Sequence, residues 1–91
     1  MEKITLDFTG CKSPLLLHMI FKETFGFPDF YGKNLSALWD CLRDYCPDDC
    51  IIYVKGTRTL PKEFGEYMEK IYEIFHDVEA EGENIQFVIV S

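Results

Sequence analysis

The sequence predicts an α/β fold in which a small three-stranded parallel sheet is flanked by helices, and a single domain covers residues 1–91. Segments with strand and helix patterns follow one another in the order strand, helix, helix, strand, helix, strand. Parallel strands need long crossover connections, which helices usually provide. The chain is also 47 % hydrophobic and 15 % aromatic, a composition typical of a packed globular domain.

The first strand and the first helix are predicted from alternation and from end signals. Residues 4–8, ITLDF, alternate apolar and polar side chains with the period of a strand. Ser13 followed by Pro14 resembles a helix N-cap with proline at the first helical position. The apolar residues that follow predict a helix to about Phe25, and Gly26 is the expected residue at its end.

A second helix is predicted after a loop at residues 27–33. Asn34 is the expected N-cap, and the helix should end near Tyr45, because Cys46 and Pro47 break the pattern. The apolar side chains of this helix lie on one side, and we expect that side to pack on the sheet. They are Leu35, Leu38, Cys41, Leu42 and Tyr45.

The second half of the chain predicts a strand, a long helix and a last strand. Residues 50–55, CIIYVK, are apolar and β-branched, which favours a strand covered on both faces. From Pro61 to Glu81, apolar residues recur at spacings of three and four, as in a helix with one buried stripe. Gly82 is its expected C-cap, and residues 85–90, IQFVIV, predict a buried strand.

The charge of the chain restricts its partners. A net charge of −7 disfavours nucleic acid and anionic membranes as direct partners and favours a basic protein. No segment approaches the ~20 apolar residues of a membrane span, and the N-terminus lacks the pattern of a secretion signal. We therefore expect a cytoplasmic protein whose four cysteines are reduced thiols.

The second helix also carries a candidate binding surface. At 100° per residue, Asp40 points away from the apolar side. Ser36, Trp39 and Arg43 lie on the same outward flank. A tryptophan beside an outward carboxylate, preceded by the aromatics of loop 27–33, has the composition of a binding hot spot. The indole could instead fold over the loop as a lid on the core, and both interpretations could hold in part.

The long helix adds a row of acidic residues, Glu69, Glu73, Asp77 and Glu81, spaced four residues apart. Like charges at this spacing repel one another. A solvated acidic face is the simpler explanation, but such a row also suits a surface that meets arginines and lysines. The sequence leaves open whether this row and Asp40 share one face.

A zinc site and an enzyme site are the alternatives from other functional classes. Cys41, Cys46 and Cys50 lack the short C-x2-C spacing typical of structural zinc. An enzyme would need Ser36 with a histidine, or Cys46 with His76, as nucleophile and base. The chain contains no glycine-rich phosphate loop and no nucleophile elbow. We therefore expect no metal, no cofactor and no catalytic residue.

The stretch from Pro28 to Leu42, PDFYGKNLSALWDCL, closely resembles the barstar family, the intracellular inhibitors of barnase-type secreted ribonucleases. The resemblance extends over essentially the whole chain, including the apolar strand that ends at Val90. It implies a barstar-like sheet flanked by helices. It also implies an acidic helix-and-loop surface that plugs the active site of one basic microbial ribonuclease, and a monomer when the protein is free.

The resemblance assigns roles to single residues. Asp40 matches the carboxylate that enters the phosphate-binding site of the ribonuclease, where it mimics an RNA phosphate. Asp77 matches an outlying acidic contact, and Glu81 is a further candidate one turn on. The residues that match contact positions around Asp40 are Tyr31, Asn34, Leu35 and Trp39.

Several positions of this surface depart from the family pattern. Ser36 stands where the prototype has a second acidic contact, and Arg43 puts a cation one turn from Asp40, where it could pair with that carboxylate or repel a basic enzyme. The alternative function is therefore an antitoxin, immunity protein or binding protein of the same fold, directed at a different basic toxin or nuclease. The predicted partner-binding set is Phe30, Tyr31, Asn34, Leu35, Ser36, Trp39, Asp40, Arg43, Asp44, Tyr45, Asp77 and Glu81.

Overall fold

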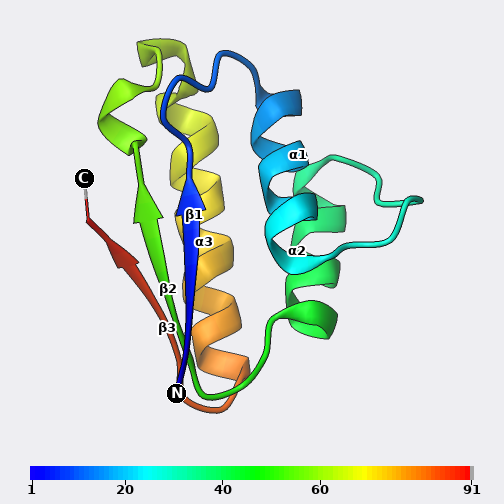
Figure 1. The fold of residues 1–91 in the computed structure, drawn as a ribbon. Coiled ribbons are helices and arrows are strands. Elements are labelled where there is room, and N and C mark those ends of the chain that lie inside the picture. The colour runs from blue at the N-terminus through cyan, green and yellow to red at the C-terminus, as the bar shows by residue number, and fades with distance from the viewer. Residues whose placement is uncertain (91) are drawn as a thin grey trace.

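The computed structural model describes residues 1–90, and within them it shows a parallel three-stranded sheet and three α-helices (Figure 1). The predicted α/β class and the predicted order of elements are confirmed. Two single turns of 3-10 helix, Thr57–Thr59 and Lys62–Phe64, precede the last helix. The elements are β1 (Glu2–Asp7), α1 (Pro14–Phe25), α2 (Leu35–Tyr45), β2 (Cys50–Lys55), α3 (Gly65–Glu81) and β3 (Ile85–Ile89).

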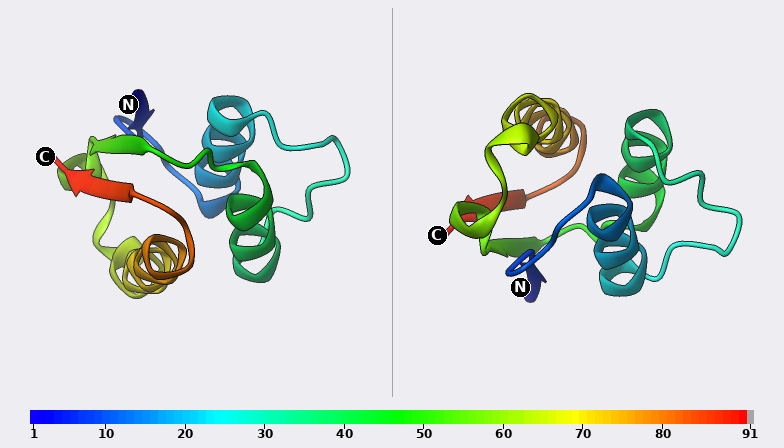
Figure 2. Two further views of the ribbon diagram at one scale, coloured as in Figure 1. Left: turned by 90° about the horizontal axis from the view of Figure 1, so that it is seen from below. Right: turned by 90° about the horizontal axis from the view of Figure 1, so that it is seen from above.

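All three helices lie on the same side of the sheet (Figure 2). The strand order is β1-β2-β3, and crossovers of the usual right hand between successive neighbours put every connecting helix on one face. The central strand shows the result, since Ile52 and Val54 are fully buried whereas Ile51 and Tyr53 are only half-buried. The expectation that this strand is covered on both faces is therefore wrong.

The second helix occupies a different place from the one expected. Its apolar side does bury Leu38 and Leu42, but the helix packs mainly against α3 and α1, and α1 is the helix that lies against β1. The connection between β1 and β2 contains two helices, and α1 takes the place beside the strand (Figure 1). The apolar side of α2 therefore packs on helices, and Tyr45 at its end is 43 % exposed.

The last strand is held by α3 in two ways. The rings of Phe75 and Phe87 stack with their centroids 4.1 Å apart. In addition, the backbone N–H of Phe87 donates to Oε2 of Glu79 at 2.8 Å. Val90 N–H donates to Val54 in the neighbouring strand, so by alternation the N–H of Phe87 points away from β2. One N–H on the open edge of β3 is thus occupied by a side chain of α3.

Both helix N-caps predicted from the sequence are present. Ser13 accepts a hydrogen bond from the N–H of Leu16 at 3.3 Å. Asn34 Oδ1 accepts from the N–H of Ala37 at 2.8 Å, and its Nδ2 donates to the carbonyl of Gly32 at 3.2 Å. These bonds satisfy donors that the first turn of a helix leaves free. The side chain of Asn34 therefore fixes where α2 begins.

A buried histidine joins three parts of the fold. His18 of α1 is 1 % exposed, and its Nδ1 lies 2.5 Å from the hydroxyl of Tyr31 in the loop before α2. Its Nε2 is hydrogen-bonded to the hydroxyl of Tyr67 in α3. A neutral imidazole has one donor and one acceptor nitrogen, so it can satisfy both hydroxyls. Burial, and secondly the charge of Lys33, lower the pKa of His18.

Replacing the cap of α2 should destabilise the protein. Asn34→Ala removes the acceptor for the N–H of Ala37, and we expect the free energy of unfolding to fall by about 1 kcal/mol in urea titrations. Asn34→Asp keeps that acceptor and places a negative charge at the N-terminus of the helix, so it should lose less than half as much even though the donor to Gly32 is gone. Equal losses in the two variants would contradict the assigned capping role.

The stability of the protein should depend on pH through His18. The unfolded chain binds a proton near the ordinary pKa of 6.5, whereas the folded state resists protonation at this position. The free energy of unfolding should therefore fall as the pH is lowered through and below this value. Urea titrations between about pH 7.5 and about pH 5.5 measure the slope.

A matched pair of variants assigns that slope to one residue. His18→Gln retains a donor and an acceptor for the two tyrosine hydroxyls but does not titrate, so its slope should be shallower than that of the parent. His76→Gln, the same substitution at an exposed histidine of α3, is the matched control. Parallel slopes for the parent and His18→Gln would rule out His18 as the source.

Candidate functional site

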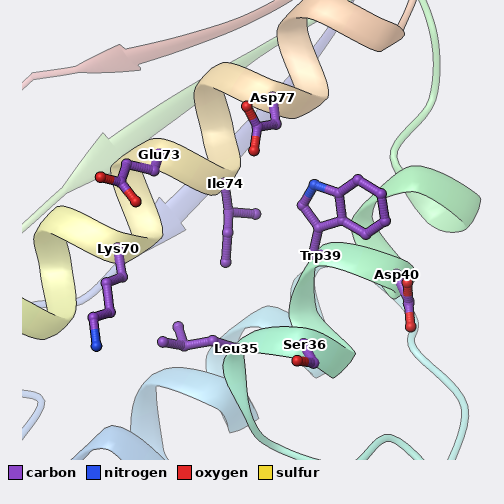
Figure 3. A pocket seen from close by; sticks show the side chains of 8 residues that line it. All are labelled: Leu35, Ser36, Trp39, Asp40, Lys70, Glu73, Ile74 and Asp77. Atoms are coloured by element: carbon purple, nitrogen blue, oxygen red, sulfur yellow. The ribbon is translucent and has the colours of Figure 1, made fainter.

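A groove of about 480 Å³ lies between α2 and α3 and brings the predicted carboxylates of the two helices together. Figure 3 shows side chains from both helices around it. Two members of the acidic row of α3, Glu73 and Asp77, therefore share one face with Asp40, a point that the sequence left open. The lining residues are Leu35, Ser36, Trp39 and Asp40 of α2 and Lys70, Glu73, Ile74 and Asp77 of α3.

The position of Asp40 follows from the burial of its neighbours on α2. Leu38 and Leu42 are fully buried, and Asp40 lies midway between them on the opposite side of the helix. Its side chain is exposed, as the periodicity predicts. In Figure 3 its carboxylate points away from α3, whereas Asp77 reaches toward the groove. Asp40 thus offers acceptor oxygens to solvent at the outer margin of the groove.

Trp39 combines the two arrangements that the sequence left open. Its indole rises from α2 toward α3 in Figure 3. The side chain is half-buried and packs against the hydrophobic core, so it covers part of that core. The rest of the ring is a wall of the groove. A fixed aromatic wall beside an exposed carboxylate is a common arrangement in protein-binding hot spots.

Arg43 contacts Trp39 and Glu81. Its guanidinium carbon lies 4.4 Å from the centroid of the Trp39 ring, and its Nε lies 2.9 Å from Oε2 of Glu81. The sequence suggested that Arg43 could pair with Asp40, but the ion pair that this structure shows is with Glu81. Arg43, Asp44 and Glu81 line a second hollow, next to the groove. The predicted acidic contact at Glu81 is thus already paired within the molecule.

Three groove residues of α3 are missing from the predicted set: Lys70, Glu73 and Ile74. They lie three and four residues apart and so share one helix face with Asp77. Their spacing predicts that these residues share a face, but it does not show that this face of α3 lies next to α2. Glu73 adds a carboxylate to the face, whereas Lys70 adds a cation that the acidic composition did not suggest.

The loop residues of the predicted set lie in different environments. Phe30 is 86 % exposed, whereas Tyr31 is 3 % exposed and is bonded to His18. Burial is the main cause that raises the pKa of Tyr31. Neither residue lines the groove, and Asn34 is occupied as the cap of α2. Tyr45 packs edge-on against Phe27, with ring centroids 5.8 Å apart.

The cysteines of the zinc alternative are packed in the fold. The sulfurs of Cys46 and Cys50 lie 3.9 Å apart, and the thiol of Cys50 donates to the carbonyl of Pro47 at 3.0 Å. Burial raises the pKa of Cys46 to about 12, which disfavours the thiolate that zinc binds. Within residues 1–90, no group of three His, Cys, Asp or Glu side chains is arranged to hold a metal.

The residue pairs of the enzyme alternative are not brought together in one hollow. Cys46 lines the hollow near Glu81, and His76 lines another, on the outer face of α3. Neither histidine lines the groove that contains Ser36.

Across the described residues, no helix has both the length and the apolar character needed to cross a membrane.

Comparison with known proteins agrees with this fold. The family model described as Barstar (barnase inhibitor) matches residues 1–91. The chain is also 31 % identical over 81 residues to a Bacillus subtilis (strain 168) protein named "Putative ribonuclease inhibitor YrdF". That alignment covers 89 % of this chain and 89 % of the relative. The chain therefore belongs to the barstar family.

Proposed function

We propose that this protein inhibits a basic microbial ribonuclease by binding it one-to-one and filling its active site with the face formed by α2 and α3. The observation that carries the proposal is the exposed Asp40 beside the Trp39 wall, on the same face as Glu73 and Asp77, in a member of the barstar family. The proposal assigns the protein no catalytic step and no cofactor. It places the protein in the cytoplasm.

The chemistry of Asp40 suits the role of a phosphate mimic. A ribonuclease holds the RNA phosphate with cationic side chains, and a carboxylate can accept the same charge-assisted hydrogen bonds. Asp40 is exposed on the outer side of α2 and needs no rearrangement to present its oxygens. The neighbouring indole of Trp39 would exclude water from these bonds when the surfaces meet.

The other carboxylates supply long-range attraction. Glu73 and Asp77 line the groove beside Asp40, and the whole chain carries a net charge of −7. Several carboxylates on one face steer a cationic cleft toward it and raise the association rate in a salt-dependent way. Asp40 should mainly control dissociation, whereas the outer acids should mainly control the rate of encounter.

The departures from the family pattern bear on the identity of the target. Ser36 stands where the prototype has an acidic contact, but Glu73 lines the same groove from α3 and adds a carboxylate there. Lys70 adds a cation to the same groove. This cation favours a second candidate target of the same kind of inhibition, namely a basic toxin or nuclease other than barnase whose cleft offers an acceptor opposite it.

Removing the Asp40 carboxylate should abolish tight inhibition. Titration of barnase and other basic secreted ribonucleases in an RNA-cleavage assay gives the inhibition constant. Asp40→Ala leaves cations of the enzyme buried without a partner, so the inhibition constant should rise by roughly a hundredfold to several thousandfold, or about 3–5 kcal/mol. Glu23→Gln removes one charge from α1, away from the groove, and should change it little.

Two results of this titration would contradict the proposal. In one, no ribonuclease of the panel is inhibited by the parent protein. In the other, Asp40→Ala inhibits as well as the parent, which would leave inhibition in place but remove the phosphate-mimic mechanism.

The outer acids should act on the association rate. Glu73→Gln and Asp77→Asn should each slow association with the inhibited ribonuclease at about 0.05 M NaCl, and the effect should shrink at about 0.5 M, where charges are screened. Dissociation rates should change little. Surface plasmon resonance at both salt concentrations measures the two rates. Effects of these variants confined to dissociation would refute the steering role.

A further inference from the structure

The only tryptophan of the chain is covered on one side by an arginine that is itself held in place. The guanidinium carbon of Arg43 lies 4.4 Å from the centroid of the Trp39 ring. The same side chain reaches Glu81 at the end of α3, with Nε and Oε2 2.9 Å apart. A chain of three contacting side chains therefore crosses from α2 to α3 over the indole.

We propose that Arg43, anchored by Glu81, is a positioning residue that holds the Trp39 indole in its orientation between α2 and α3. This inference rests on the proposed function, because it concerns how the binding face is kept ready for a partner. Arg43 and Glu81 would act through Trp39 rather than through contacts of their own. We name Trp39, Arg43 and Glu81 together the indole clamp.

Helix geometry supports the clamp. Arg43 lies four residues after Trp39 on α2, the spacing at which two side chains of a helix contact each other. A planar guanidinium can stack on an aromatic face and still use its edge for an ion pair, which an ammonium group cannot do. Because Glu81 belongs to α3, the ion pair fixes Arg43 from the neighbouring helix.

The exposure of the ion pair indicates what the clamp does. The side chains of Arg43 and Glu81 are 45 % and 49 % exposed, and pairs this open to solvent contribute little to overall stability. The clamp therefore acts mainly by restricting the motion of the indole rather than by stabilising the fold. An indole that is ordered before binding loses less entropy when a partner arrives.

The clamp also determines which charges remain available to a partner. Arg43 lies three residues after Asp40 and could have paired with it, but its ion pair is with Glu81. The Asp40 carboxylate is left exposed, and the opposite charges of Arg43 and Glu81 largely cancel. In this proposal Glu81 has a role inside the molecule, and the contact with a partner predicted from the sequence stays a prediction.

The clamp can be tested in the free protein, because Trp39 is its only tryptophan. Arg43→Met uncovers one face of the indole, so the constant for fluorescence quenching by acrylamide should rise roughly twofold, and the fluorescence anisotropy should fall. Arg43→Lys keeps the charge without the planar stack and should give an intermediate value. Arg58→Met removes the other arginine, in the Thr57–Thr59 turn, and should give the parental value.

Salt provides a second test of the same contact. In the parent, about 1 M NaCl should weaken the ion pair to Glu81 and raise quenching toward the Arg43→Met value. In Arg43→Met and in Glu81→Gln the same salt should have little effect, because the ion pair is already absent. Circular dichroism and the Tm should show that all variants remain folded, since the mutated side chains are exposed.

Binding to the ribonuclease that the parent inhibits completes the experiment. Arg43→Met should speed dissociation roughly twofold to tenfold, the range expected when one large side chain must be ordered during binding. It should not slow association, because it makes the face more acidic. A purely electrostatic role of Arg43 would change association and leave dissociation alone.

The outcomes separate this inference from the proposed function. Unchanged quenching and anisotropy in Arg43→Met and Glu81→Gln would overturn the clamp, even if the parent inhibits a ribonuclease. Altered quenching with an unchanged dissociation rate would overturn its role in binding. If the fluorescence changes appear as expected but no ribonuclease is inhibited, the clamp stands and the proposed function fails.

Discussion

The whole arrangement depends on one constraint, which is that three helices share one face of a three-stranded sheet. Strands that follow in spatial order, joined by crossovers of one hand, put each helix on that face. α3 then lies beside both the sheet and α2, and the groove forms where these two helices meet. Side chains that are more than 30 residues apart in sequence, such as Asp40 and Asp77, become neighbours on one surface.

Much of the fold could be predicted because its signals are local. The caps Ser13 and Asn34 appear where the sequence indicates helix starts, and these depend only on the next three residues. The coverage of β2 could not be predicted in this way, because an apolar run has the same sequence pattern whether the second face of the strand is fully buried or half-buried. The start of α3 was also misplaced, because a turn of 3-10 helix precedes Gly65.

The same distinction between local signals and tertiary packing applies to the candidate site. Helix periodicity placed Asp40 outward, since that depends on α2 alone. The environment of Tyr31 depends on His18 and Tyr67, which come from α1 and α3, and no local pattern indicates such a hydrogen-bond network. The partner of Arg43 depends in the same way on how α2 and α3 pack. Sequence reasoning found the chemical groups of the surface, and tertiary packing decided which of them are free.

The contact between Glu79 and the backbone of Phe87 has a consequence for the behaviour of the protein at high concentration. β3 is an edge strand with an apolar end, where Val88, Ile89 and Val90 are 36–47 % exposed. Such an edge is a template on which another chain can add a strand, the first step of aggregation. Because a carboxylate already occupies an outward N–H in the middle of β3, an incoming strand would have to displace it and would meet its charge. The Glu79 carboxylate thus hinders the addition of a strand at the edge of β3.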